Sequence, residues 1–146
     1  MGDQDPSRAD IARVQATFDR LWPTANDTAE RFYALLFEST PQLRTLFHGD
    51  PDAQRRKFMS TLAVMVGSLD DTDKLFSAAR TLARQHVDYG VKAAHYPALG
   101  AALMGALESR LGDEWNAETA AAWSKVFQLL SKHMIEEAYA GRARPE

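Results

Sequence analysis

The sequence has no cysteine among its 146 residues, which excludes disulfides, thiolate zinc sites and cysteine nucleophiles. It also lacks an excess of basic residues: 17 Lys and Arg against 20 Asp and Glu give a net charge of −3. This charge gives no positive electrostatic field that would attract nucleic acid or anionic lipid. No apolar run approaches membrane-spanning length, and the acidic start, Met-Gly-Asp-Gln-Asp-Pro, is unlike a signal peptide. We therefore expect a cytoplasmic protein with no nucleic-acid or membrane partner.

Strand patterns are missing as well, because apolar and polar residues never alternate over four residues. Paired catalytic carboxylates find no support, since the aspartates cluster at expected helix starts, where capping explains them. No glycine-rich phosphate loop and no Ser/His/Asp set stands out either. A composition of 45% hydrophobic and 25% charged residues is typical of a globular chain. We expect one all-α domain over residues 1–146, with a core from about 8 to 140 and loose ends.

Apolar residues recur at intervals of three and four along most of the chain, which predicts six long helices and one short one. The first begins at a capping-box pattern, Ser7 with Asp10, and ends near Trp22-Pro23. Cap-proline pairs, Thr40-Pro41 and Asp50-Pro51, begin the short helix and the long helix after it. The remaining boundaries are expected at residues 70–73, Gly90, Gly112 and Asn116.

One histidine stands out as a candidate ligand. Leu75, Leu82 and His86 fall on one stripe at helical spacing, so the imidazole points inward near the end of an apolar helix. Gly90 is expected to end that helix, and Tyr96 lies in the first turn of the next. A lone histidine there is usually a half-buried core residue, and the alternative is a neutral imidazole that binds a metal. The periodicity by itself leaves both interpretations open.

Motifs in the first half of the chain resemble a known family. Phe32-Tyr33-Ala-Leu-Leu-Phe37, followed by Pro41-Gln-Leu-Arg-Thr-Leu-Phe47, is similar to the second and third helices of globins. Gln54-Arg-Arg-Lys57-Phe58-Met59 is similar to the start of the globin distal helix. These motifs follow one another in the order that the family shows.

Motifs in the second half extend this resemblance. Leu82-Ala-Arg-Gln-His86-Val-Asp-Tyr-Gly90-Val91, followed by His95-Tyr96, is similar to the proximal helix and turn of bacterial single-domain globins and of the globin half of flavohaemoglobins. Ala122-Trp123 is similar to the opening of the last globin helix. The resemblance covers roughly Ile11 to Tyr139 and implies a three-on-three helical sandwich around haem b, iron protoporphyrin IX.

On the proximal side, the resemblance implies that neutral His86 ligates the iron. Its second ring N–H would donate to a backbone carbonyl near Leu82. Phe47 would stack on the porphyrin, and Tyr96 matches the proximal tyrosine of flavohaemoglobins. The apolar wall of the pocket would be completed by Val91, Leu99 and Leu103.

On the distal side, the resemblance implies Tyr33, Gln54 and Phe58. A phenol O–H and an amide N–H can both donate to the partly negative outer atom of bound oxygen. Without the resemblance, Tyr33 would be a core aromatic residue and Gln54 a surface glutamine. Lys57 would reach a haem propionate or remain solvated, and Lys57 or Tyr33 could bind the iron when no gas is present.

The sequence also departs from the flavohaemoglobin pattern. Counted from Trp123, the proximal glutamate position falls on Ala138, and Glu137 lies one residue short, which is a turn of about 100° on a helix. Phe58 is bulkier than the leucine that is common there. Three further histidines are weaker candidates: His48 in a loop, His95 after the proximal corner, and His133, expected to point outward.

The expected function is reversible binding of O2, NO or CO by a haem protein that is a monomer or a homodimer. Conversion of nitric oxide to nitrate would fit the distal donors, but it would need a separate reductase. An oxygen carrier or store and a gas sensor are the alternatives, and a haem-free helical interaction module is a weaker one. Whether the chain is an enzyme stays open.

Overall fold

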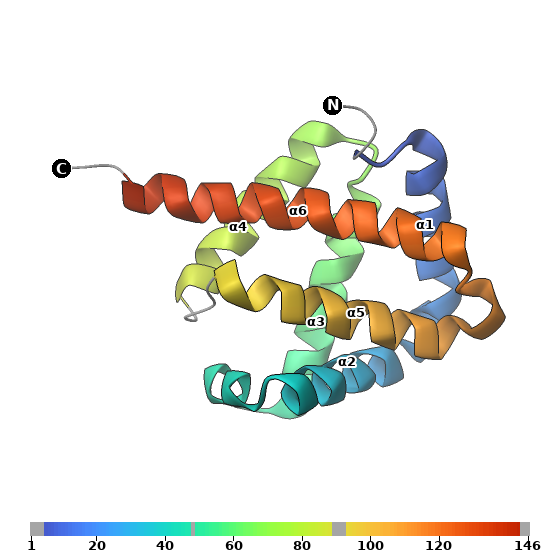
Figure 1. Ribbon diagram of the computed structural model, residues 1–146, viewed down its shortest axis with the longest axis horizontal. Coiled ribbons are helices and arrows are strands. Elements are labelled where there is room, and N and C mark those ends of the chain that lie inside the picture. The colour runs from blue at the N-terminus through green and yellow to red at the C-terminus, as the bar shows by residue number, and fades with distance from the viewer. Residues whose placement is uncertain (1–4, 48, 89–92, 144–146) are drawn as a thin grey trace.

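The computed structural model of the chain describes residues 5–47, 49–88 and 93–143 (Figure 1). No strand occurs in these ranges, so the all-α prediction is confirmed. No helix among them is both long enough and apolar enough to cross a bilayer. The α-helices are α1 (Arg8–Leu21), α2 (Ala25–Ser39), α3 (Pro51–Gly67), α4 (Thr72–Asp88), α5 (Tyr96–Leu111) and α6 (Ala117–Ala143), and the short 3-10 helices are η2 (Trp22–Thr24), η3 (Pro41–Leu46), η4 (Ala93–His95) and η5 (Gly112–Glu114).

Several helix ends fall where the sequence predicts them. Ser7 Oγ accepts from the Asp10 backbone N–H at 3.0 Å, and Asp10 Oδ2 accepts from the Ser7 N–H at 2.9 Å, which completes the capping box of α1. Asn116 Oδ1 accepts from the Thr119 N–H at 2.9 Å at the start of α6. Gly112 ends α5 with φ +57°, a conformation that glycine adopts without steric cost.

The two cap-proline pairs behave differently. Asp50 accepts from the Asp52 N–H at 3.4 Å and begins α3 as predicted. Thr40, by contrast, makes no side-chain cap hydrogen bond, and Pro41 opens a 3-10 helix rather than an α-helix. The short element therefore exists, but it begins with the fixed backbone of proline and without a threonine cap.

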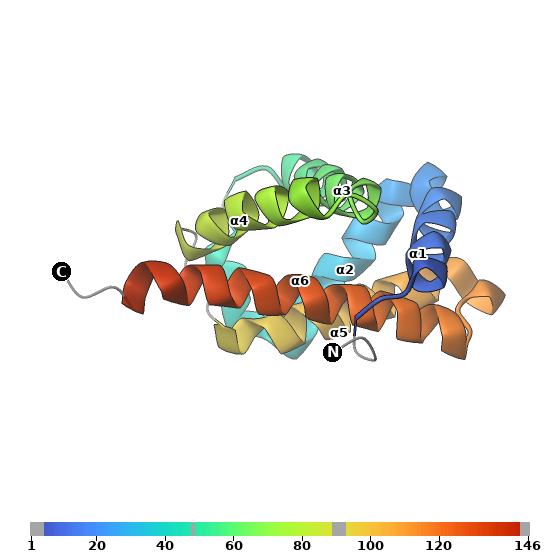
Figure 2. The ribbon, with the colours of Figure 1, turned by 90° about the horizontal axis from the view of Figure 1, so that it is seen from above.

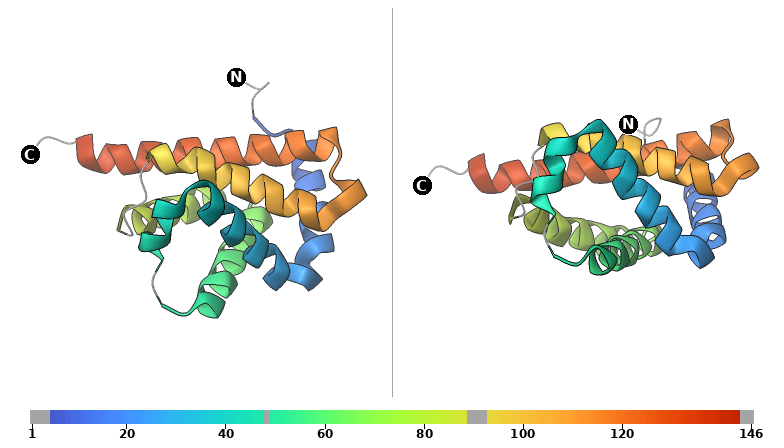
Figure 3. Two further views of the ribbon diagram at one scale, coloured as in Figure 1. Left: turned by 60° about the horizontal axis from the view of Figure 1, so that its bottom comes forward. Right: turned by 90° about the horizontal axis from the view of Figure 1, so that it is seen from below.

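The helices form two layers. In Figure 1, α5 and α6 run beside one another across the front, and α3 and α4 lie behind them. The view from above separates these groups, and the views in Figure 3 show α2 crossing below α5 (Figures 2 and 3). The most extensive helix contacts join α2 to α5, α4 to α6 and α1 to α6. This arrangement agrees with the expected sandwich of three helices on three.

Buried aromatic packing fixes α1 against α6. Trp123 is only 1% exposed, and its ring lies 6.4 Å from that of Phe18. Its Nε1–H donates to Thr17 Oγ1 at 2.9 Å, and the Thr17 hydroxyl donates to the Arg13 carbonyl at 2.7 Å. The only polar atom of the indole is therefore satisfied inside the core, as buried polar groups require.

Two glycines let α5 lie close to both of its neighbours. A Cβ at Gly100 would stand 2.5 Å from Cε2 of Phe127 on α6. A Cβ at Gly105 would stand 2.8 Å from Cδ1 of Leu35 on α2. Since real Cβ contacts are longer, these positions set the depth at which α5 carries its apolar face into the molecule.

Candidate functional site

A cluster of aromatic rings surrounds Tyr33, where α2, the end of η3 and α3 meet. The Tyr33 ring centroid lies between 5.1 and 5.9 Å from the centroids of four phenylalanine rings. We call these four rings the Tyr33 box: Phe32, Phe37, Phe47 and Phe58. Two predicted distal residues, Tyr33 and Phe58, and the predicted porphyrin neighbour Phe47 are therefore brought together.

The rings of the box also contact one another. Phe58 on α3 stacks on Phe32 of α2, with centroids 4.2 Å apart and planes 13° from parallel. Phe47 meets the edge of Phe37 at 5.5 Å. Offset-stacked and edge-to-face pairs are favourable aromatic geometries, so the box holds the phenol between rings that are themselves fixed.

The Tyr33 side chain is half-buried in apolar surroundings. Burial raises the pKa of Tyr33 from 10.0 to about 12 because the phenolate would lose water. None of the hydrogen bonds found among the described residues uses this hydroxyl. Tyr33 is thus a protonated hydrogen-bond donor at neutral pH.

The predicted polar residues of α3 lie near its beginning. Gln54 is half-buried one turn before Phe58, and Lys57 is exposed. Between them, Arg55 pairs with Asp52 on α3 and donates to Asn26 Oδ1 of α2 at 3.3 Å. These contacts tie the first turn of α3 to α2, and the half-burial of Gln54 differs from the exposure expected of an ordinary surface glutamine.

The helix that carries the candidate iron ligand is α4, and His86 lies in its last turn. Leu75, Ala79 and Ala83 are at most 3% exposed, which confirms an apolar face leading toward His86. Leu82, one turn before it, is half-buried. The His86 side chain, Val91 and Gly90 lie outside the described residues, so their roles stay predictions.

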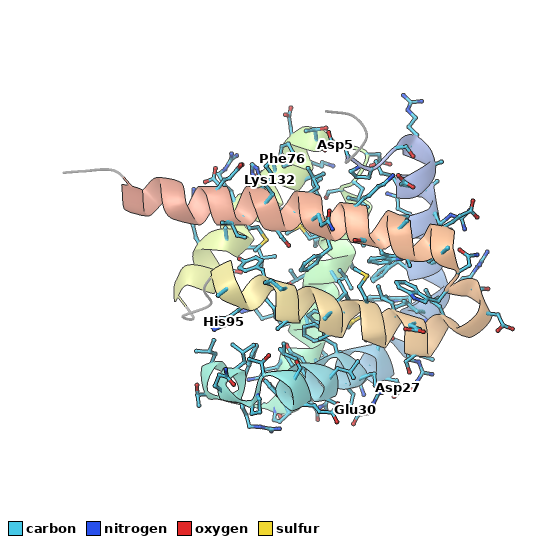
Figure 4. The ribbon with its side chains drawn as sticks, viewed as in Figure 1. Asp5, Asp27, Glu30, Phe76, His95 and Lys132 are labelled. Carbon is cyan, nitrogen blue, oxygen red and sulfur yellow. The ribbon has the colours of Figure 1, made fainter. Side chains whose placement is uncertain are left out.

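Predicted pocket residues at the start of α5 are buried or half-buried. Tyr96 and Leu103 are each 7% exposed, and Leu99 is half-buried. Burial raises the pKa of the Tyr96 phenol. His95 is half-buried at the position before α5 and lies on the side of α5 that faces α2 and η3 (Figure 4).

One prediction about the remaining histidines is wrong. His133 does not point outward: its ring stacks on Phe76 of α4 at 4.3 Å, and its Nε2 is buried without a hydrogen-bond partner among the described residues. The ring is covered by Phe76 of α4, a helix that packs against α6. His48 lies outside the described residues. Glu137 is half-buried, and the Ala138 side chain is not among those described.

Two open grooves flank the C-terminal part of α3, and neither is lined by a residue of the Tyr33 box. One has a volume of about 470 Å³ and runs between α3 and α4, beside the exposed Val64. The other has a volume of about 410 Å³ and runs between α1 and α3, beside the exposed Trp22. Neither groove is lined by a predicted site residue, and no group of three His, Asp or Glu side chains in the described ranges could hold a metal ion.

Some neighbours of Tyr33 were not predicted from the sequence. Phe32 and Phe37 belong to the motif that suggested Tyr33, but neither was assigned a role. Arg44 was also missed, although its guanidinium carbon lies 4.6 Å above the Phe37 ring. The spacing of four between Tyr33 and Phe37 was a usable signal, because such residues are neighbours on a helix, whereas nothing in the sequence marks Arg44.

Comparison with known sequences gives a consistent result. A family model described as Globin matches residues 30–134. An uncharacterized globin-like protein of Aquifex aeolicus is 30% identical over 129 residues, which cover 88% of this chain and 91% of that protein. A flavohemoprotein of Chromobacterium violaceum is 26% identical over 125 residues, covering 84% of this chain and 31% of that protein. The chain therefore spans about a third of the length of that flavohemoprotein.

Solved structures agree on the fold. A bacterial globin of Campylobacter jejuni matches with a TM-score of 0.83 at 20% identity, covering 94% of this chain and all of that one. An engineered carbene transferase from Rhodothermus marinus, provisionally assigned as a nitric oxide dioxygenase, matches with a TM-score of 0.84 at 27% identity. That match covers 95% of this chain and 99% of the other.

Proposed function

The chain belongs to the globin family, and from this premise we propose that it binds haem b and, through it, O2, NO or CO. The observation that supports the proposal is the position of Tyr33, whose half-buried phenol lies against four phenylalanine rings. In such apolar surroundings a phenol O–H can donate to a ligand with less competition from water. A small gas whose outer atom is partly negative would accept this hydrogen bond.

The residues present fit the cofactor. A flat apolar macrocycle would need apolar neighbours, and Phe47 after η3, Phe58 on α3, and Leu99 and Leu103 on α5 would supply them. His86, in the last turn of α4, would hold the iron through a neutral ring nitrogen. When bound, the haem supplies a ferrous iron that takes up diatomic gases reversibly.

The chain's own residues would then act on the gas. Tyr33 would donate its phenol O–H, and Gln54 would donate its amide N–H from one turn before Phe58. The rings of the box would keep water out, and a hydrogen bond in such surroundings is stronger than in water. Neutral His86 and protonated Tyr33 are both required; a phenol is protonated at neutral pH, and burial raises the pKa of Tyr33 further, to about 12.

Turnover of nitric oxide with oxygen is the finer part of the proposal. It is supported by the flavohemoprotein relatives and by the Rhodothermus marinus structure, and a separate reductase would supply the electrons. Oxygen carriage is the second candidate, and the oxygen dissociation rate separates the two because carriage needs fast release. A cytoplasmic location and a monomeric or dimeric state remain expectations.

The test is a titration of the purified protein with hemin, followed by visible spectra of the ferric and the dithionite-reduced forms. We expect a strong Soret band in the wild type and in His133→Ala, and loss or a marked weakening of that band in His86→Ala. The matched control is apt because His133 stacks on Phe76, far along α4 from His86. A wild-type protein without a stable Soret band would refute the proposal and favour a haem-free interaction module.

A further inference from the structure

An exposed arginine covers the Tyr33 box from outside. The guanidinium carbon of Arg44 lies 4.6 Å above the ring of Phe37. Phe37 is half-buried, and its ring lies 5.8 Å from that of Tyr33, with planes 27° apart. Arg44, Phe37 and Tyr33 therefore form a series from the solvent to the half-buried phenol.

Arg44 also contacts a second ring of the box, Phe47, through its main chain. Its backbone carbonyl accepts from the N–H of Phe47 at 3.2 Å. The Phe47 ring in turn meets Tyr33 at 5.4 Å and Phe37 at 5.5 Å, both edge-on. Two of the four rings around the phenol are thus fixed by one residue of η3, through its side chain for Phe37 and its main chain for Phe47.

We propose that Arg44 is a positioning residue whose guanidinium, placed over Phe37, covers part of the solvent-facing side of the Tyr33 box and limits the access of water to the phenol. The side chain acts through Phe37 and touches no ligand. The box remains partly accessible on this side, because Phe37 and Phe47 are only half-buried. Removing the guanidinium lets Phe37 move and lets water approach the phenol.

Two effects of Arg44 on the phenol have opposite signs, which makes the inference testable. Loss of the cover admits water, stabilises the phenolate and lowers the pKa of Tyr33. Loss of the positive charge alone would destabilise the phenolate and raise that pKa. The sign of the shift therefore separates the two effects, and the inference expects the pKa of Tyr33 to fall in Arg44→Ala.

The experiment uses cofactor-free protein labelled with fluorotyrosine, whose phenol ionises at lower pH than tyrosine, and follows each fluorine resonance against pH. The Tyr33 resonance is assigned as the one lost in Tyr33→Phe. We expect its midpoint to fall in Arg44→Ala and to stay close to the wild-type value in Arg44→Lys, which keeps a cation over Phe37. Arg31→Ala, which removes an exposed arginine of α2, is the matched control and should leave the midpoint unchanged.

An unchanged or raised midpoint in Arg44→Ala would overturn the inference, as would equal shifts in Arg31→Ala and Arg44→Ala. A second measurement rests on the proposed function: in the haem-loaded protein, Arg44→Ala should release oxygen about two to five times faster, with CO release unchanged. Failure to bind hemin would refute the proposed function and leave the fluorine result standing. Faster release of both gases to the same extent would contradict the positioning role.

Discussion

Substituting Tyr33 with phenylalanine removes the hydroxyl oxygen and leaves the ring in the aromatic box. The neighbouring rings, at 5.1 to 5.9 Å, need not move. No protein acceptor among the described residues loses a hydrogen bond, since the hydroxyl serves none of them. The substitution therefore isolates what the hydroxyl does for a ligand.

The size of the effect follows from the surroundings of the phenol. A hydrogen bond to a partly charged acceptor contributes about 1.5–3 kcal/mol, and burial of Tyr33 places the bond in a medium where water competes poorly. We therefore expect oxygen to dissociate about 10 to 100 times faster from Tyr33→Phe. The stability of the cofactor-free protein should barely change, because the packing is conserved.

The assay is stopped-flow displacement of oxygen by excess CO from the reduced, haem-loaded protein. Release of CO itself, followed by displacement with NO, is the internal control, because CO carries little negative charge on its outer atom. An unchanged oxygen rate would remove Tyr33 from the ligand site. An equal acceleration for oxygen and CO would show that the variant has opened the space, and the hydrogen-bond argument would fail.

Three further outcomes follow from the packing and the charges. Phe58→Leu, which loses the 4.2 Å stack on Phe32, should lower the free energy of unfolding by about 1–2 kcal/mol and let an alkyl isocyanide bind the haem-loaded protein more tightly. Gly100→Ala, whose Cβ would stand 2.5 Å from Phe127, should cost about 1–3 kcal/mol in urea unfolding. Burial raises the pKa of Tyr33 from 10.0 to about 12, so between these pH values the folded chain keeps a proton that the unfolded chain loses. The free energy of unfolding measured in urea should therefore fall as the pH rises from 10 toward 12. The same fall should be smaller in Tyr33→Phe.

The helices were predictable because local chemistry specifies their ends. The capping box of Ser7 and Asp10 and the turn at Gly112 depend on residues within a few positions of each boundary. The start of η3 was less predictable, because a Thr-Pro pair suits an α-helix and a 3-10 turn alike. Contacts between distant segments decide such cases, and a single sequence does not contain them.

The candidate site shows the same difference between local motifs, which the sequence contains, and contacts between distant segments, which it does not. Tyr33 and Phe58 could be named from motifs, but their meeting at 5.9 Å depends on how α3 docks on α2. The orientation of His133 was mispredicted for the same reason, since the ring that covers it comes from α4. Arg44 belongs to no motif, and its contact with Phe37 arises only because η3 folds back along α2.

The surroundings of the Tyr33 hydroxyl therefore depend on the tertiary structure. The rings around Tyr33 come from α2, the segment after η3, and α3, so the apolar surroundings of the phenol form only when these three segments are docked together. A ligand that accepts from this phenol stabilises the docked arrangement, because it binds the folded state and not the unfolded one. Variants of the box that weaken the docking of α3 on α2 should accordingly release oxygen faster. Such a fixed donor would slow the release of oxygen, which does not suit an oxygen carrier that needs fast release.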